Sequence, residues 1–64
     1  MAKLFFYQNG EAKFVEISPE THERLRLFSQ KIFSNSAQVA VSVYERFGNV
    51  SEELILRYLD ELDQ

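Results

Sequence analysis

The N-terminal part of the chain holds two short runs of mostly apolar residues with the length and composition of β-strands. Two runs, residues 3–8 and 11–17, are rich in aromatic and β-branched side chains and flank the dipeptide Asn9-Gly10. Asn-Gly is the strongest short-range signal for a β-hairpin, because a type I′ turn needs positive φ at both central residues. The sequence therefore predicts an N-terminal β-hairpin with strands at 3–8 and 11–17.

A two-residue turn also fixes the register, and this register gives the hairpin two apolar faces. One face carries Phe5, Tyr7 and Phe14, and the other carries Leu4, Phe6, Val15 and Ile17. A hairpin with one side in water should be apolar on one face only, so we expect something to cover the second face. Because Ile17 abuts the first helix, we assign its face to the core. The face with Phe5, Tyr7 and Phe14 is then the candidate partner-binding surface.

A helix is predicted to begin at Ser18-Pro19. Serine is a favoured N-cap, and proline suits the first helical position because its fixed φ is helical and its missing N–H is not needed there. The apolar positions recur at helical spacing, as Leu25, Phe28 and Ile32. We therefore predict a helix over about 19–33 with this stripe buried. Leu27 falls nearly opposite the stripe and is added to the candidate partner-binding residues.

Residues 38–44 fit two structures. As a strand, three valines at alternate positions would share one face, and valine favours strands. As a helix, the segment has an apolar face made of Ala37, Ala40, Val41, Tyr44 and Phe47. Candidate N-caps at 34–36 and the glycine at Gly48, a natural residue just after a helix, favour the helix. We predict a helix over about 36–47 and keep a third strand at 38–44 as the alternative.

The last element is an amphipathic helix over about 51–62. Ser51 is a good N-cap, and Val50 can pack against Ile55 as a hydrophobic staple. The apolar stripe consists of Leu54, Ile55, Tyr58, Leu59 and Leu62. The whole chain, 1–64, is therefore expected to form one small α+β domain, a hairpin followed by two or three short helices.

The length and the composition limit how this domain can be stabilised. A chain of 64 residues buries only about 60% of its unfolded surface, and domains of this size often add disulfides, metals or oligomerisation. The sequence has no cysteine and one histidine, which excludes disulfides, thiolate metal sites and a multi-histidine site within one chain. We expect no metal or cofactor, and we expect a homo-oligomer.

Charge is concentrated at the C-terminal end. Residues 1–51 hold six Lys or Arg and five Asp or Glu, whereas residues 52–64 hold one Arg and five Asp or Glu. This acidic segment should not lie on phosphates, which need clustered Lys and Arg. An inhibitor that imitates nucleic acid through its acidic surface is one alternative function.

Residues 37–62 loosely resemble a helix-turn-helix motif. The resemblance consists of a short turn at Gly48 and a capped second helix, and it implies a small DNA-binding regulator. The first turn of that second helix would enter the major groove, but it holds Glu52 and Glu53, which phosphates repel. A DNA-binding regulator is therefore kept as an alternative, and nucleic acid is not the expected partner.

Catalytic motifs are missing from the sequence. His22 is the one imidazole and lies in the first turn of an exposed helix, and the two glycines, Gly10 and Gly48, stand apart from any phosphate-binding loop. There is no apolar run of about 20 residues and no signal-peptide pattern, so we expect a cytoplasmic protein without membrane contact. The expected function is a small non-enzymatic protein-binding module or regulator that acts through an apolar aromatic surface.

Overall fold

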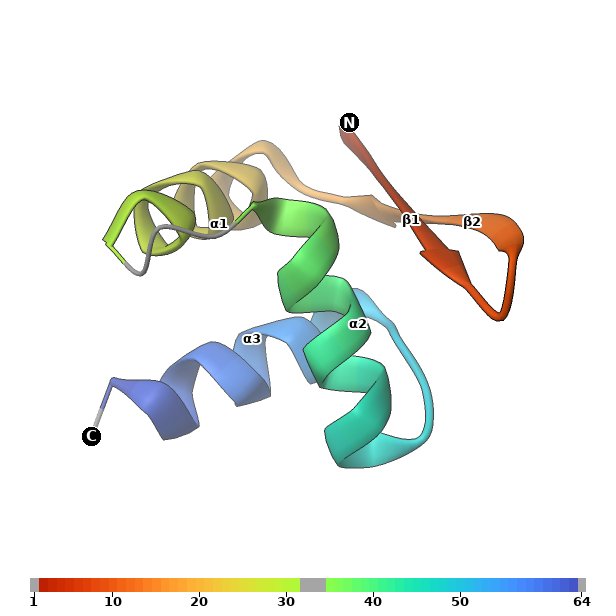
Figure 1. The fold of residues 1–64 in the computed structure, drawn as a ribbon. Helices are drawn as coiled ribbons and strands as arrows, with labels where there is room; N and C mark the ends of the chain where they lie inside the picture. Colours follow the sequence, from red (N-terminus) through yellow and green to blue (C-terminus); the bar gives the residue numbers. More distant parts are fainter. Residues whose placement is uncertain (1, 32–34, 64) are drawn as a thin grey trace.

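The computed structural model describes residues 2–31 and 35–63. Over these residues the chain forms two β-strands followed by three α-helices (Figure 1). The elements are β1 (Ala2–Gln8), β2 (Glu11–Ile17), α1 (Pro19–Lys31), α2 (Ser36–Phe47) and α3 (Glu52–Leu62). The helices lie on one side of the hairpin. The predicted α+β fold is confirmed.

The hairpin has the turn and the register that the sequence predicts. Asn9 and Gly10 have φ values of 54° and 80°, as a type I′ turn requires. The strands pair antiparallel, with Phe5 opposite Phe14 and Leu4 opposite Val15. The two faces therefore separate as expected. Leu4, Phe6 and Ile17 are buried and Val15 is half-buried, so the face assigned to the core is the one that packs against the helices.

Helix α1 begins at Pro19, as predicted, and its start is tied back to the preceding residue. The Ser18 hydroxyl accepts a hydrogen bond from the Thr21 backbone N–H at 3.3 Å. Leu25 is fully buried and Phe28 is half-buried against the core. The predicted end of this helix, with Ile32 and Phe33, lies outside the described residues. Leu27 is exposed, in agreement with its position opposite the stripe.

The ambiguous segment 38–44 is helical, and the alternative of a third strand is wrong. The two ends of α2 decide between helix and strand. Each end has a cap that pairs with a backbone N–H or C=O group left without a partner at a helix terminus. Asn35 Oδ1 accepts from the Gln38 backbone N–H at 2.7 Å. Gly48, at φ 78°, donates its N–H to the Tyr44 carbonyl at 2.7 Å. The caps therefore override the strand preference of the valines.

The buried stripe of α2 is rotated relative to the apolar face read from the sequence. Val39, Ala40 and Val43 are buried, whereas Tyr44 is exposed and Val41 only half-buried. The reason is that α2 packs against β1, and the small and β-branched side chains of the stripe fit against the strand more closely than a tyrosine would. Tyr44 is thereby left at the surface.

Helix α3 is capped as predicted. The Ser51 hydroxyl accepts from the Leu54 backbone N–H at 3.2 Å, and Val50 packs against the core. Ile55 and Leu59 are buried, and Leu54 and Tyr58 pack against them from the edge of the core. The buried stripe of α3 ends earlier than predicted. Leu62, its last predicted member, is 48% exposed.

The core is formed by all five elements. Its buried apolar members are Leu4, Phe6, Ile17, Leu25, Val39, Ala40, Val43, Ile55 and Leu59. The helices cover the inner face of the hairpin, which carries Leu4, Phe6 and Ile17. The opposite face, with Phe5, Tyr7 and Phe14, contributes no side chain to this core. Among residues 2–31 and 35–63, none of the helices is long and apolar enough to cross a membrane.

Candidate protein-binding surface

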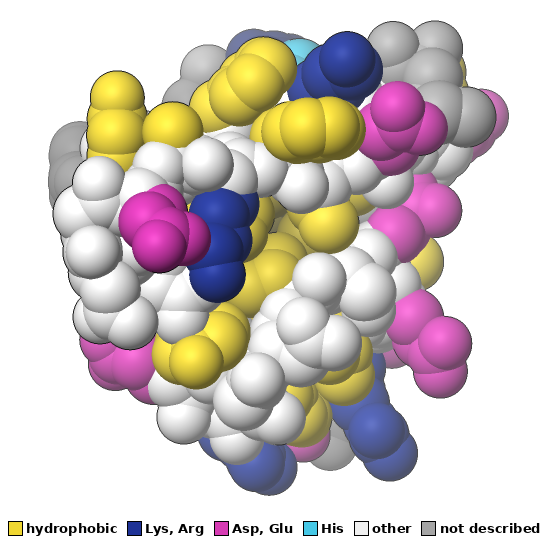
Figure 2. Space-filling view, turned by 90° about the vertical axis from the view of Figure 1, so that its right-hand side faces the viewer, with side chains coloured by type: hydrophobic (Ala, Val, Ile, Leu, Met, Phe, Trp, Pro, Cys, Tyr) yellow, Lys and Arg dark blue, Asp and Glu magenta, His cyan; other side chains and the backbone are white. Residues whose placement is uncertain are grey.

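The hairpin face that points away from the helices carries three of the four predicted partner-binding residues. We call it the outer face; its members are Lys3, Phe5, Tyr7, Ala12, Phe14 and Glu16, all exposed. Phe5 is 63% exposed, Tyr7 73% and Phe14 54%. Figure 2, which looks at the hairpin side of the molecule, shows hydrophobic side chains gathered over the upper part of this view. The structure therefore places large apolar side chains in water on a hydrogen-bonded pair of strands.

Two of these aromatic residues form the centre of the outer face. Phe5 and Phe14 are directly opposite each other across the strands, and their ring centroids are 5.9 Å apart at an interplanar angle of 43°. Tilted pairs at this separation are favourable, because the positive edge of one ring approaches the negative face of the other. This contact restrains both rings on the outer face.

A pair of charged residues lies at one end of the same face. Lys3 is opposite Glu16 in the register. The Lys3 Nζ atom stands 4.9 Å from the centroid of the Phe14 ring, within the range of a cation–π interaction. The ammonium group therefore lies over the outer face and not beside it.

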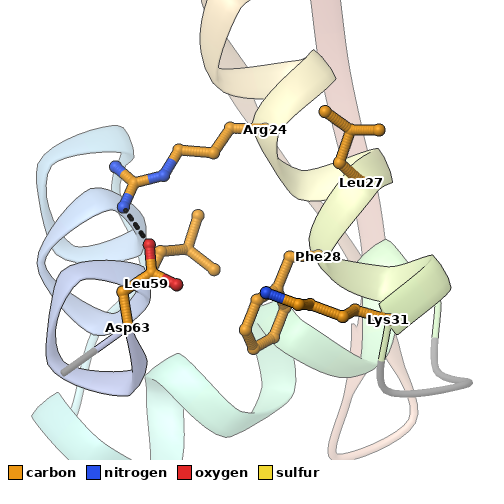
Figure 3. A pocket seen from close by; sticks show the side chains of 6 residues that line it. All are labelled: Arg24, Leu27, Phe28, Lys31, Leu59 and Asp63. Carbon is orange, nitrogen blue, oxygen red and sulfur yellow. Dashed lines mark hydrogen bonds and ion pairs between the residues drawn. The ribbon is translucent and has the colours of Figure 1, made fainter.

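Leu27, the fourth predicted partner-binding residue, belongs to a different surface. It lines a groove of about 330 Å³ between α1 and α3, together with Arg24, Lys31 and Asp63 (Figure 3). The floor of this groove includes the core residues Phe28 and Leu59, as sequence spacing alone could not reveal. The structure thus brings Phe5, Tyr7 and Phe14 together and leaves Leu27 apart from them.

A second, smaller hollow lies on the helix side of the hairpin. It measures about 220 Å³ and lies between the hairpin and the turn that joins α2 to α3. The hairpin lines it mainly with inner-face residues, among them Phe6, Lys13 and Val15, and Tyr44 and Val50 line it from the other side. Sequence reasoning missed Tyr44 as a surface aromatic, because its position fitted the apolar face of α2.

The acidic C-terminal segment is engaged in ion pairs within the molecule. Asp60 pairs with Arg24 at 2.6 Å, and Asp63 lies 3.5 Å from the same guanidinium. Glu61 pairs with Arg46 at 3.3 Å. These contacts join α3 to α1 and α2, and each places a positive charge beside a carboxylate. The segment is therefore a partly neutralised surface, and this weakens its likeness to a row of phosphates.

The first turn of α3 packs against the junction between the hairpin and α1. The backbone N–H of Ser18 donates to Glu52 Oε2 at 2.5 Å. This hydrogen bond, followed by one from the Thr21 hydroxyl, lowers the pKa of the Glu52 carboxyl below its ordinary value of 4.5. In a helix-turn-helix protein the corresponding turn must be free to enter the major groove. Here one of its side chains is hydrogen-bonded to the backbone that precedes α1.

The Glu52 contact should make the stability of the protein depend on pH. A carboxyl whose pKa is lowered by folding stabilises the folded state above its unfolded pKa, and this contribution is lost as the pH falls through the folded pKa. We expect the free energy of unfolding of the wild type to fall on acidification below about pH 4.5. Glu52→Gln, which cannot titrate, should fall less. Urea unfolding at pH 7 and at pH 3 measures this difference, and equal losses in the two proteins would contradict the assignment.

Catalytic and metal-binding groups do not converge in the part of the chain that the structure describes. His22 is exposed in the first turn of α1. Over the described ranges, no group of three or more His, Cys, Asp or Glu side chains is arranged to hold a metal ion.

No protein-family model, curated protein or solved structure matches this chain.

Proposed function

We propose that this chain is a small protein-binding module that acts through its outer face and carries out no chemistry of its own. The observation that carries the proposal is the exposure of Phe5, Tyr7 and Phe14 on strands whose opposite side already forms the core. Contiguous exposed apolar patches on soluble domains mark interaction surfaces more often than chance. Burying these side chains against another protein would remove apolar area from water. The loss of conformational entropy would be small, because strand pairing already fixes their backbone.

The outer face has the properties of a binding surface dominated by a few anchors. A buried Phe or Tyr covers about 150–250 Å², and aromatic side chains are enriched among the residues that supply most of the binding energy in protein interfaces. Strand pairing fixes the backbone of these residues, and the contact between Phe5 and Phe14 restrains their rings. The module would bind by covering or bridging a surface of its partner, with little loss of side-chain freedom.

Two observations favour a protein over nucleic acid as the partner. Glu52, at the helix end that a helix-turn-helix protein would insert into DNA, bonds to Ser18. Asp60 and Glu61, which a phosphate mimic would present, pair with Arg24 and Arg46. The charged groups are thus used within the fold, whereas the aromatic side chains of the outer face point into solvent.

Capture experiments with matched variants test the proposal. The double variant Phe5→Ser/Phe14→Ser removes both central anchors, and Leu62→Ser removes an apolar side chain from α3 that is also about half exposed. With the chain as bait against a lysate that also contains a tagged copy of itself, the double variant should retain at least about thirtyfold less bound protein, from about 2 kcal/mol of lost anchor energy. Leu62→Ser should behave as the wild type. A folded double variant with undiminished capture would refute the proposal.

A further inference from the structure

We propose that the outer face binds a second copy of this chain, with the two hairpins packed face to face about a two-fold axis that runs along the strands. This inference rests on the proposed function, because it names the occupant of the same surface. It is carried by the pairing of side chains across the two strands. The outer face consists of three cross-strand rows, and these rows are Lys3 with Glu16, Phe5 with Phe14, and Tyr7 with Ala12.

Each row is self-complementary under this symmetry. A two-fold axis along the strands places β1 of one copy over β2 of the other, row by row. Lys3 then lies over the Glu16 of the second copy, so opposite charges meet twice. Tyr7 lies over the second Ala12, so a large side chain meets a small one twice. Phe5 lies over the second Phe14, and the four rings form the centre of the interface.

The positions of the charges select this axis over the other in-plane choice. A two-fold axis across the strands would place Lys3 over Tyr7 and Glu16 over Ala12, and no charge would meet its opposite. The Lys3 ammonium lies 4.9 Å from the centroid of the Phe14 ring in the single chain, so its charge is positioned over the outer face. Two twisted sheets pack face to face at about 30°, an offset that long Lys and Glu side chains accommodate.

The size of the outer face sets the strength of the expected dimer. Three aromatic side chains of about 150–250 Å² each, exposed by 54–73%, offer a few hundred Å² per copy. Interfaces that bury less than about 1,200 Å² in total belong to weak, reversible complexes. We therefore expect a dimer that forms and dissociates at roughly micromolar to millimolar concentration.

Complementary charge reversal tests the arrangement. Lys3→Glu leaves two negative charges in the row of residues 3 and 16 on the outer face, and Glu16→Lys leaves two positive charges there. By sedimentation equilibrium the wild type should dimerise, and each variant alone should dimerise at least about tenfold more weakly, because like charges now face each other twice. An equimolar mixture of the two variants should recover the dimer, because every contact then joins opposite charges.

The mixture also separates dimerisation from folding. Each substitution places like charges opposite each other within its own hairpin, and mixing two chains cannot relieve that repulsion. Circular dichroism should show that both variants remain folded. Recovery in the mixture therefore reports contacts between chains.

Several results would overturn the inference. A wild type that stays monomeric to millimolar concentration would overturn it. Charge-reversal variants that dimerise as strongly as the wild type would also overturn it, because that behaviour is expected of strands that pair edge to edge. A mixture that stays monomeric would refute the two-fold arrangement. If the outer face captures other proteins while the chain itself remains monomeric, the inference fails and the proposed function stands. If the outer face captures neither other proteins nor a second copy of the chain, the inference and the proposed function both fail.

Discussion

Phe6→Ala should leave the protein largely unfolded at room temperature. Phe6 is 5% exposed and belongs to the inner face of β1, among the residues that α2 covers. Removing a buried phenylalanine ring costs about 3–5 kcal/mol, from lost burial and from the cavity that remains. At about 0.05–0.15 kcal/mol per residue, a domain of this size has a total stability of similar magnitude. Thermal and urea unfolding followed by circular dichroism would measure the loss.

The neighbouring residue provides the matched control for Phe6. Phe5→Ala makes the same chemical change one position away, on a side chain that is 63% exposed. We expect it to cost about 1 kcal/mol, chiefly from the lost ring contact with Phe14. The variant should therefore remain folded. If Phe5→Ala unfolds the protein and Phe6→Ala does not, the inner and outer faces of the hairpin have been exchanged.

Leu25→Ala should be the second most damaging of these substitutions. Leu25 is fully buried at the centre of α1, and truncating a buried leucine costs about 2–5 kcal/mol. The midpoint of urea unfolding should fall accordingly, with the slope unchanged because the fold buries nearly the same surface. A loss below about 1 kcal/mol would contradict the place of α1 in the core.

Leu27→Ala is the control on the same helix. It makes the identical change two residues away, on a side chain that is 53% exposed. Substitutions at such positions change stability by about 0.5 kcal/mol or less. A large loss of stability here would mean that the groove between α1 and α3 is more tightly closed than the structure shows.

Local sequence signals were sufficient for the elements whose ends are fixed by neighbouring residues. Asn9-Gly10 specifies a type I′ turn, and this two-residue turn fixes the register that pairs Phe5 with Phe14. The helix over 36–47 was harder, because valine propensity opposed it. Its caps, Asn35 and Gly48, were readable in the sequence and proved decisive.

Contacts between distant residues could not be predicted in this way. The hydrogen bond from Ser18 to Glu52 and the ion pair between Arg24 and Asp60 join residues more than 30 positions apart. Neither has a local pattern, because each depends on how α3 packs against α1. The exposure of Tyr44 has the same origin, since the rotation of α2 about its axis is set by its packing on β1.

The candidate surface was predictable where it depends on strand periodicity. Alternation with a period of two placed Phe5, Tyr7 and Phe14 on one face, and burial of the opposite face left them exposed. Leu27 was correctly predicted to be exposed. Its separation from the three aromatic residues followed only from the arrangement of α1 beside α3.

Site-specific photo-crosslinking would test the central claim most directly. A benzophenone side chain in place of Tyr7 would lie on the outer face, in the row next to the turn, and the same group in place of Leu62 would lie on α3 as the control. We predict that irradiation at position 7 joins the chain to another polypeptide, whether a second copy or a different protein, and that position 62 gives far less product. If position 7 yields no product beyond that of position 62 while the variant remains folded, the outer face is not a protein-binding surface.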